Sequence, residues 1–248
     1  MIQLAGRRAL VTGAGKRVGA AIARALGRAR MHVAVHYHES SEGAAAVANE
    51  IRNDGGTADL FAANLYEPEA RRALIDSVVE KLGGLDLLVL GAANFDRVEF
   101  NDITDDHLAR ALALNLVAPF HLARHAAQAL RATRGSIVFI TCSSAKTPYK
   151  NHLPYVVSKG ALSHLTQALA LELAPEVRVN AVAPGTVLPP PEMSAEAVAS
   201  LANSVPLRRT GTAEDIADSV LYLAQADFVT GQEIAVDGGR STARTGRF

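Results

Sequence analysis

The sequence has little of three things: cysteine, aromatic residues and net charge. Its 248 residues include a single cysteine, Cys142, only 5% aromatic residues, and 25 basic side chains balanced by 25 acidic ones. One cysteine excludes an internal disulfide framework and a multi-thiolate zinc site, so we expect no metal. Without a basic tract or a run of about 18 apolar residues, neither nucleic acid nor a membrane is an expected partner. We therefore expect a cytoplasmic protein that acts on a small molecule.

Short aliphatic runs alternate with longer segments of helical period along the chain. This order is typical of right-handed βαβ units, and a 49% hydrophobic fraction with few aromatic residues suits buried parallel strands. Because no low-complexity linker divides the chain, residues 1–248 are expected to form one doubly wound α/β domain, a seven-stranded parallel sheet with helices on both faces. The expected strands are Arg8 to Thr12, His32 to Tyr37, Thr57 to Ala62, Leu85 to Leu90, Ser136 to Thr141, Arg178 to Ala183 and Glu233 to Val236.

Segments of helical period fill the gaps between these strands. Thr104 and Thr212 stand where helix N-caps are expected. The proline-rich segment from Ala183 to Ser194 fits neither a helix nor a central strand, and it follows the sixth strand, where substrate loops of such sheets gather. We expect it to border the active site. The expected helices are Arg17 to Arg28, Glu42 to Asn53, Pro68 to Leu82, Asp105 to Arg131, Pro154 to Leu173 and Ala213 to Ala224.

A glycine-rich turn follows the first expected strand. The segment Thr12-Gly13-Ala14-Gly15-Lys16-Arg17-Val18-Gly19 opens directly into a helical pattern. Glycines let the backbone approach a pyrophosphate, whose charge is met by free amides and the positive end of the helix dipole. This strand-turn-helix context predicts a dinucleotide-binding site of the Rossmann type.

The end of the second expected strand indicates which dinucleotide binds. An acidic residue there would bind the adenosine ribose of NAD and repel a 2′-phosphate. His36 stands at this position, close to His38. Lys16 and Arg17 in the glycine turn can bind a phosphate by charge-assisted hydrogen bonds, although Glu39 argues against this choice. NADPH is therefore expected, and the alternative for the two histidines is a polar strand end without a ligand.

A tyrosine and a lysine share one face of an expected helix. Lys159 follows Tyr155 by four residues, which places the phenol beside the ammonium group. The ordinary pKa of a phenol is about 10, and a nearby cation lowers it by stabilising the phenolate. Such a pair predicts a proton donor for a substrate under reduction. The alternative interpretation is a solvated helix face, because this spacing is common by chance.

Several motifs accompany this pair in the same order along the chain. They are the turn from Thr12 to Gly19, Asn115 in Asn-Leu-Val-Ala-Pro-Phe, Tyr155 with Lys159, Pro184-Gly185, and Val236-Asp237-Gly238-Gly239. Together they resemble the short-chain dehydrogenase/reductase family over nearly the whole length. The resemblance implies that the tyrosine transfers the proton, that the lysine holds the nicotinamide ribose and lowers the tyrosine pKa, and that the asparagine seats a water in a proton relay.

Within this family, two features resemble the pteridine reductases. Arg17 stands where most members have the middle glycine of the turn, and His36 to His38 follow the second strand. That branch uses NADPH and stacks a pterin on an aromatic ring, whose position Phe95 matches. Phe95 and Arg17 are therefore the expected substrate-binding residues, although an isolated phenylalanine at this point is often part of the core.

Two positions depart from the family pattern. Thirteen residues before Tyr155, where a serine or aspartate is usual, the chain has Cys142, whose thiol is a weak hydrogen-bond donor. Ser143 follows and could substitute for it. The run from Gly91 to Asn94 also lacks the usual paired asparagines, and Asn64 stands where an aspartate often binds adenine.

Three functions follow as competing hypotheses. The first is an NADPH-dependent reductase of a pterin-like ring, the second a carbonyl reductase acting on a 3-oxoacyl thioester or small ketone, and the third an NADPH-binding sensor or scaffold with little turnover. The resemblance also implies a homodimer or homotetramer. The expected catalytic residues are Asn115, Cys142, Tyr155 and Lys159, and the expected cofactor-binding residues are Gly13, Lys16, Arg17, Val18, Gly19, His36, Tyr37, His38, Ser40, Asn64, Leu65, Tyr155, Lys159, Pro184, Gly185 and Val187.

Overall fold

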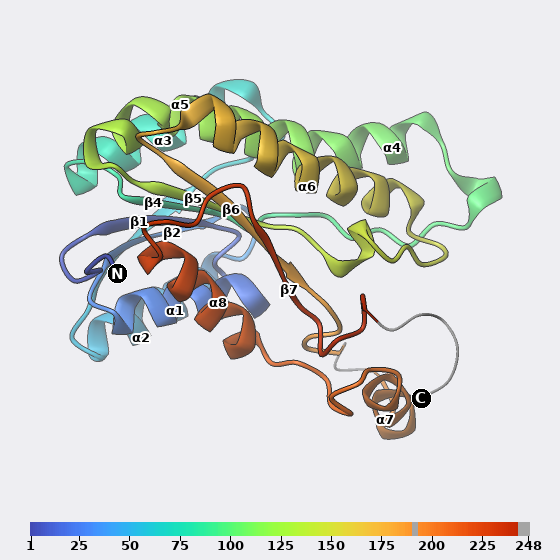
Figure 1. Cartoon of the computed structure of the whole chain (residues 1–248). Coiled ribbons are helices and arrows are strands. Elements are labelled where there is room, and N and C mark those ends of the chain that lie inside the picture. The colour runs from blue at the N-terminus through green and yellow to red at the C-terminus, as the bar shows by residue number, and fades with distance from the viewer. Residues whose placement is uncertain (190–192, 243–248) are drawn as a thin grey trace.

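Seven parallel strands form one sheet at the centre of the molecule (Figure 1). The structure is a computed structural model and describes residues 1–189 and 193–242. The strand order is β3-β2-β1-β4-β5-β6-β7, so the chain runs outward in both directions from the β1/β4 pair. In an open sheet of this kind, ligands bind beyond the carboxyl ends of the strands where the order reverses. The strands are β1 (Arg8–Thr12), β2 (His32–Tyr37), β3 (Thr57–Ala62), β4 (Leu87–Leu90), β5 (Ser136–Ile140), β6 (Arg178–Pro184) and β7 (Glu233–Val236).

Helices cover both faces of this sheet (Figure 1). α1, α2 and α8 lie on one face, and α3, α4, α5 and α6 lie on the other. The fold class predicted from the sequence is confirmed. The helices are α1 (Arg17–Arg28), α2 (Ser41–Asn53), α3 (Pro68–Leu82), α4 (Asp105–Leu112), α5 (Ala118–Thr133), α6 (Leu153–Leu173), α7 (Ala195–Asn203) and α8 (Ala213–Gln225), with short 3₁₀ turns at Phe100–Asp102 and Ser143–Ala145.

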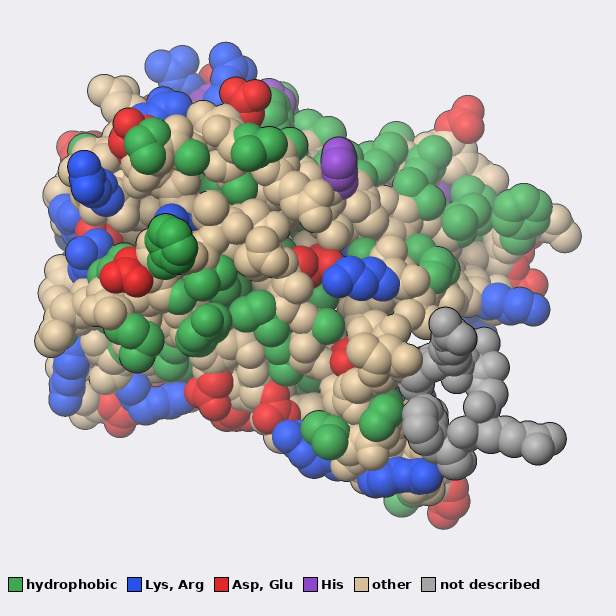
Figure 2. Space-filling view, viewed as in Figure 1, with side chains coloured by type: hydrophobic (Ala, Val, Ile, Leu, Met, Phe, Trp, Pro, Cys, Tyr) green, Lys and Arg blue, Asp and Glu red, His purple; other side chains and the backbone are tan. Residues whose placement is uncertain are grey.

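The core is aliphatic and lies in two layers, one on each side of the sheet. The central strands β4 and β5 are buried along their whole length, as expected for parallel strands covered on both faces. Within the described residues, no helix is long and apolar enough to cross a membrane. On the face shown in Figure 2, hydrophobic side chains gather over α8, and Tyr222 and Phe228 are among the exposed apolar residues of the chain.

Most element boundaries agree with the sequence prediction to within two residues, and both predicted N-caps are confirmed. Thr104 and Thr212 each accept a hydrogen bond from the backbone amide three residues later. The expected helix from Asp105 to Arg131 is wrong in one respect, because a π-helical turn at Ala113–Val117 separates α4 from α5. The short helix α7 had no counterpart in the prediction. Residues 190–192 of the predicted active-site loop lie outside the described residues.

Candidate active site

The glycine turn between β1 and α1 is a close-packed cradle of backbone. A Cβ atom on Gly19 would lie 2.2 Å from the carbonyl oxygen of Gly13, and one on Gly15 would lie 2.9 Å from the carbonyl oxygen of Ser40. Both positions therefore need glycine. The hydroxyl of Thr12 accepts the amides of Gly91 and Ala92, at 3.0 and 3.2 Å, and so fastens the segment after β4 to the turn.

Arg17 occupies the left-handed region of backbone conformation. Its φ of +52° is a value that side-chain-bearing residues rarely adopt, which explains why glycine is usual at this position. The guanidinium donates a 2.5 Å hydrogen bond to the carbonyl oxygen of Leu188, in the loop after β6. Arg17 thus bridges the glycine turn and the loop predicted to border the site.

His36, one of the expected cofactor-binding residues, bonds to the protein backbone through both nitrogens of its ring. Its ring is buried, the amide of Gly13 donates to Nδ1 at 3.1 Å, and Nε2 lies 3.2 Å from the carbonyl oxygen of Ala63. Burial lowers the His36 pKa to about 4, so the ring is neutral, with the proton on Nε2. Both nitrogens are occupied, and His36 therefore supports the turn from behind.

The other residues expected at the adenosine end come together around a cleft of about 160 Å³. Glu39 also lines it, with a side chain 89% exposed. The Asn64 side-chain oxygen accepts the amide of Tyr66 at 3.1 Å and retains a second lone pair. Two expected residues face elsewhere, because Tyr37 and Val18 pack against the hydrophobic core. The expected residues that line the cleft are Lys16, His36, His38, Ser40, Asn64 and Leu65.

Tyr155 and Lys159 lie on one face of α6, as predicted from their spacing. The Lys159 ammonium lies 5.7 Å from the centroid of the Tyr155 ring and donates a 2.8 Å hydrogen bond to the carbonyl oxygen of Ile140. Burial lowers the Lys159 pKa to about 8. The Tyr155 pKa is raised, mainly by burial and then by Cys142 and Tyr149, whereas the sequence suggested that it would be lowered. The phenol is consequently a protonated group at neutral pH.

Asn115 lies in the π-helical turn and is fully buried. Its amide group holds both the backbone amide and the carbonyl of Asn94, at 3.0 and 3.2 Å, and donates to the Ser158 hydroxyl at 3.0 Å. Ser158 in turn donates to the carbonyl oxygen of Tyr155 at 2.7 Å. The side chain therefore fixes the segment after β4 against α6, and the predicted water-binding role stays a prediction.

Cys142 lies beside the candidate catalytic tyrosine. The thiol is close enough to Tyr155 and Tyr149 to raise the pKa of both phenols. Its sulfur accepts the backbone amide of Ser144 at 3.5 Å and thereby caps the 3₁₀ turn that follows. Ser143, the expected substitute, is buried.

An aromatic cluster next to Tyr155 was only partly foreseen. The Phe95 side chain is 57% exposed. Its ring stacks on the His152 ring at a centroid distance of 4.3 Å, and it forms a T-shaped pair with the Tyr155 ring at a centroid distance of 4.7 Å. Tyr149 lies 6.4 Å from Phe95 and 5.3 Å from His152. Sequence reasoning missed Tyr149 and His152, although both stand within six residues before Tyr155.

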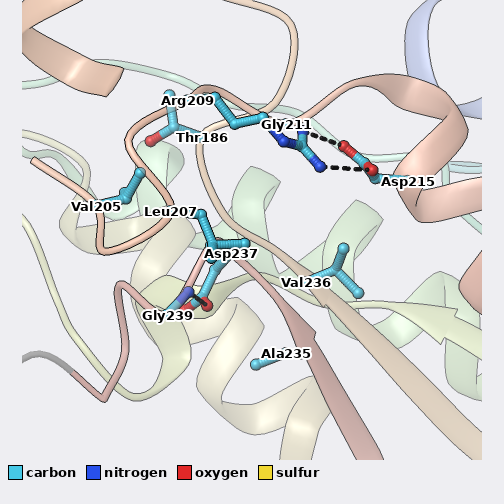
Figure 3. A pocket seen from close by; sticks show the side chains of 11 residues that line it. Thr186, Val205, Leu207, Arg209, Gly211, Asp215, Ala235, Val236, Asp237 and Gly239 are labelled. Carbon is cyan, nitrogen blue, oxygen red and sulfur yellow. Dashed lines mark hydrogen bonds and ion pairs between the residues drawn. The ribbon is translucent and has the colours of Figure 1, made fainter. Parts of the chain in front are cut away.

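The remaining expected residues lie where β6 ends. A Cβ atom on Gly185 would lie 2.4 Å from the Cβ of Asp237, so the segment after β7 packs directly on it. Val187 forms a bridge with Gly211. A neighbouring cleft has a volume of about 280 Å³. Figure 3 shows its lining side chains, which include the ion pair of Arg209 and Asp215.

These features fit a nicotinamide dinucleotide. The glycine cradle leaves no room for side chains where a pyrophosphate would lie, and the adenosine cleft joins it. Three buried polar atoms, the Asn94 side-chain oxygen, the Ser144 hydroxyl and Glu233 Oε2, have no hydrogen-bond partner of good geometry among residues 1–189 and 193–242. A bound ligand could supply such partners, because buried polar groups are nearly always hydrogen-bonded.

Comparisons with known proteins agree with this arrangement. Residues 13–241 match the family model described as enoyl-(acyl carrier protein) reductase. The versicolorin reductase of Emericella nidulans is 35% identical, over 96% of each chain, and glucose 1-dehydrogenase 2 of Bacillus subtilis is 30% identical, over 95% of each. The structure of a doubly substituted short-chain dehydrogenase/reductase from Serratia marcescens superposes with a TM-score of 0.90 at 31% identity, covering 97% of this chain and 100% of that one.

Proposed function

The chain belongs to the short-chain dehydrogenase/reductase family and is thus a nicotinamide-dependent oxidoreductase, and we propose that it uses NADPH to reduce a flat, pterin-like ring. The observation that carries the choice of substrate is the exposed Phe95 ring beside Tyr155. Because His152 stacks on one face of the Phe95 ring, a flat substrate ring would lie on the other face, next to the catalytic phenol. We further infer that residues 1–248 act as one dinucleotide-binding domain, since all seven strands join one sheet.

The preference for NADPH rests on charge at the adenosine cleft. Lys16 and His38 line this cleft, and the acidic side chain there, Glu39, is highly exposed and lies 3.9 Å from the His38 ring nitrogen Nδ1. A lysine favours a 2′-phosphate, and an exposed carboxylate repels it less than a buried one would.

Tyr155 is proposed as the proton donor. When bound, the nicotinamide supplies the hydride. Because its pKa is raised, Tyr155 holds its proton at neutral pH and can give it to the substrate nitrogen or oxygen next to the reduced carbon. Lys159, with a pKa of about 8, is mostly charged at neutral pH and stabilises the phenolate that remains. Asn115 holds the segment after β4, through Asn94, against helix α6, through Ser158.

A second candidate is reduction of a carbonyl group, such as a 3-oxoacyl thioester or a small ketone. One comparison favours it, because a relative from Streptomyces violaceoruber that is 34% identical over 93% of this chain is named as a ketoacyl reductase of granaticin synthesis. Tyr155 would serve both substrates in the same way, by protonating the atom beside the new C–H bond.

The experiment that separates these candidates is a substrate panel. The purified protein is titrated with NADPH and NADH, and the absorbance of NADPH is followed after addition of dihydrobiopterin, dihydrofolate or an acetoacetyl thioester. Preferential oxidation of NADPH by a pterin supports the first proposal. Oxidation by the thioester alone selects the second, and NADPH binding without turnover by any compound selects the sensor or scaffold.

We also propose a homo-oligomer, either a dimer or a tetramer. α5 and α6 carry exposed apolar side chains, including Phe120, Val157 and Leu171, and the last is 83% exposed. Exposed apolar groups of this size, on helices that cover the same face of the sheet, are typical of interfaces. Light scattering of the full chain tests this, and a monomeric mass at micromolar concentration would contradict it.

A further inference from the structure

Tyr149 holds a fixed place at the catalytic centre that the proposed reaction does not yet use. It lies between the 3₁₀ turn Ser143–Ala145 and α6, and its ring contacts Phe95 and His152. The loop that carries it is joined to the segment after β4 by a 2.8 Å hydrogen bond from the amide of Val98 to the carbonyl of Asn151. The ring is therefore held on two sides.

The phenol end of Tyr149 lies among the groups that surround Tyr155. The side chains of Cys142 and Ser144 are both close enough to affect the Tyr149 pKa, which burial raises. Tyr149 in turn contributes to the raised pKa of Tyr155. The two phenols therefore face the same thiol, and both keep their protons at neutral pH.

Arg240 adds a positive charge near this phenol. It lies close enough to Tyr149 to act against the rise in its pKa, and its guanidinium donates a 2.8 Å hydrogen bond to the Thr186 hydroxyl. A nearby cation makes a phenol a better hydrogen-bond donor without removing its proton.

Cys142 cannot supply a strong second hydrogen bond to the substrate. Its sulfur already accepts the amide of Ser144, and a thiol is a weak donor. A single hydrogen bond from one phenol fixes the distance to the accepting atom of the substrate better than it fixes the orientation of the substrate, which can still rotate about that bond. A second donor would fix it.

We propose that Tyr149 is this second donor: its hydroxyl binds the same substrate atom that Tyr155 protonates, and so replaces the side chain that usually precedes the catalytic tyrosine by thirteen residues. The substrate is then held by an acceptor atom between two phenols and by its plane on Phe95. The inference rests on the proposed reductase function but applies to a pterin nitrogen and a carbonyl oxygen alike.

A pair of substitutions tests this inference. Tyr149→Phe removes the hydroxyl and keeps the ring packing, and Cys142→Ser restores a hydroxyl donor at the neighbouring position. With the best substrate of the panel, Tyr149→Phe should lower kcat/KM by about tenfold to a hundredfold while the NADPH Kd stays within twofold. In the Cys142→Ser background, the same substitution should cost less than about threefold.

The matched control is Tyr222→Phe, which removes a hydroxyl from a half-exposed tyrosine of α8. It should leave kcat/KM unchanged in both backgrounds. An unchanged kcat/KM for Tyr149→Phe, or an equal loss in the two backgrounds, overturns the role of Tyr149 while the reductase stands. If the wild-type protein oxidises NADPH with no substrate of the panel, the reductase function fails and this inference fails with it.

Discussion

The two ends of the proposed nucleotide cleft are built by different means. At the adenosine end and the glycine turn beside it, backbone packs on backbone: Gly19 abuts the carbonyl of Gly13, and a buried neutral His36 accepts the Gly13 amide from behind. At the substrate end, side chains from two separate loops form the walls, with Phe95 stacked on His152. The closely packed backbone of the glycine turn leaves almost no space for an added side-chain atom. At the substrate end, one side chain can replace another while the backbone stays in place. Substitutions that crowd the backbone should therefore cost more at the first end, and exchanges of side chains should be easier at the second.

The largest expected effect tests the chemistry of the substrate end alone. Tyr155→Phe removes the hydroxyl that is proposed to donate the proton. It should lower kcat by about 10³-fold, which is within the range of rate losses seen when a general acid is removed. The NADPH Kd, measured by fluorescence titration, should change little because the adenosine end is untouched. A kcat within tenfold of the wild type would show that another group donates the proton.

The next effect tests how firmly His36 supports the adenosine end. Its folded-state pKa of about 4 lies below the ordinary value of 6.5, so between these values the unfolded chain binds a proton that the folded chain does not. The contribution of His36 to the free energy of unfolding is therefore fully present above pH 6.5 and is lost as the pH drops toward 4. For a ring this deeply buried, the loss is about 3 kcal/mol. Urea titrations across this window measure the loss.

The control for this pH dependence is a second histidine variant. His36→Gln should be less stable at neutral pH but should show a shallower fall in the free energy of unfolding on acidification. His164→Gln, on an exposed position of α6, should keep the wild-type slope. Identical slopes for the wild type and His36→Gln would mean that the ring is not held neutral in the folded protein.

A smaller effect is expected from crowding the glycine cradle. Gly19→Ala places a methyl group 2.2 Å from the Gly13 carbonyl oxygen, so the turn must open. Overpacking of this kind costs about 1–3 kcal/mol, and we expect NADPH to bind about tenfold to a hundredfold more weakly. Gly160→Ala on α6 is the matched control, since nothing lies within 4 Å of the added atom. Equal NADPH affinities for both variants would contradict a pyrophosphate bound at this turn.

The smallest effect concerns the choice between the two nicotinamide cofactors. Lys16→Ala removes an exposed cation from the adenosine cleft and should lower the preference for NADPH over NADH about fivefold. Lys150→Ala, whose side chain belongs to the substrate-side loop, should leave the ratio unchanged. The comparison is made from kcat/KM with each cofactor, at low ionic strength and again at high salt, where the effect should shrink.

The fold could be predicted from the sequence because parallel strands and their helices leave strong local patterns. Aliphatic runs marked all seven strands, and Thr104 and Thr212 marked two helix starts. The break at Ala113–Val117 left no such mark, since its residues fit an ordinary helix as well as a π-helical turn. α7 was missed because the prolines before it dominate that segment.

In the candidate site, only the residues whose relative positions follow from backbone geometry could be predicted. The spacing of Tyr155 and Lys159 follows from helix periodicity, and their shared face is confirmed. The contacts of His36 could not be predicted from its place at a strand end, because its hydrogen bonds to Gly13 and Ala63 join residues distant in the sequence. Its role in cofactor binding stays a prediction. Tyr149 could not be identified from the sequence, because its place in the site depends on packing against Phe95, which is distant in the sequence.

The π-helical turn at Ala113–Val117 also sets a limit on the length of this chain. Such a turn holds one residue more than the α-helix would need, and Asn115 sits inside it. Deleting one residue there would let the turn close into regular α-helix, and Asn115 would lose the position from which its side chain bonds Asn94 and Ser158. Substitutions on the solvent side of α4 should be well tolerated, but insertions and deletions should not. Natural variation in this region is therefore expected in residue type and not in residue number.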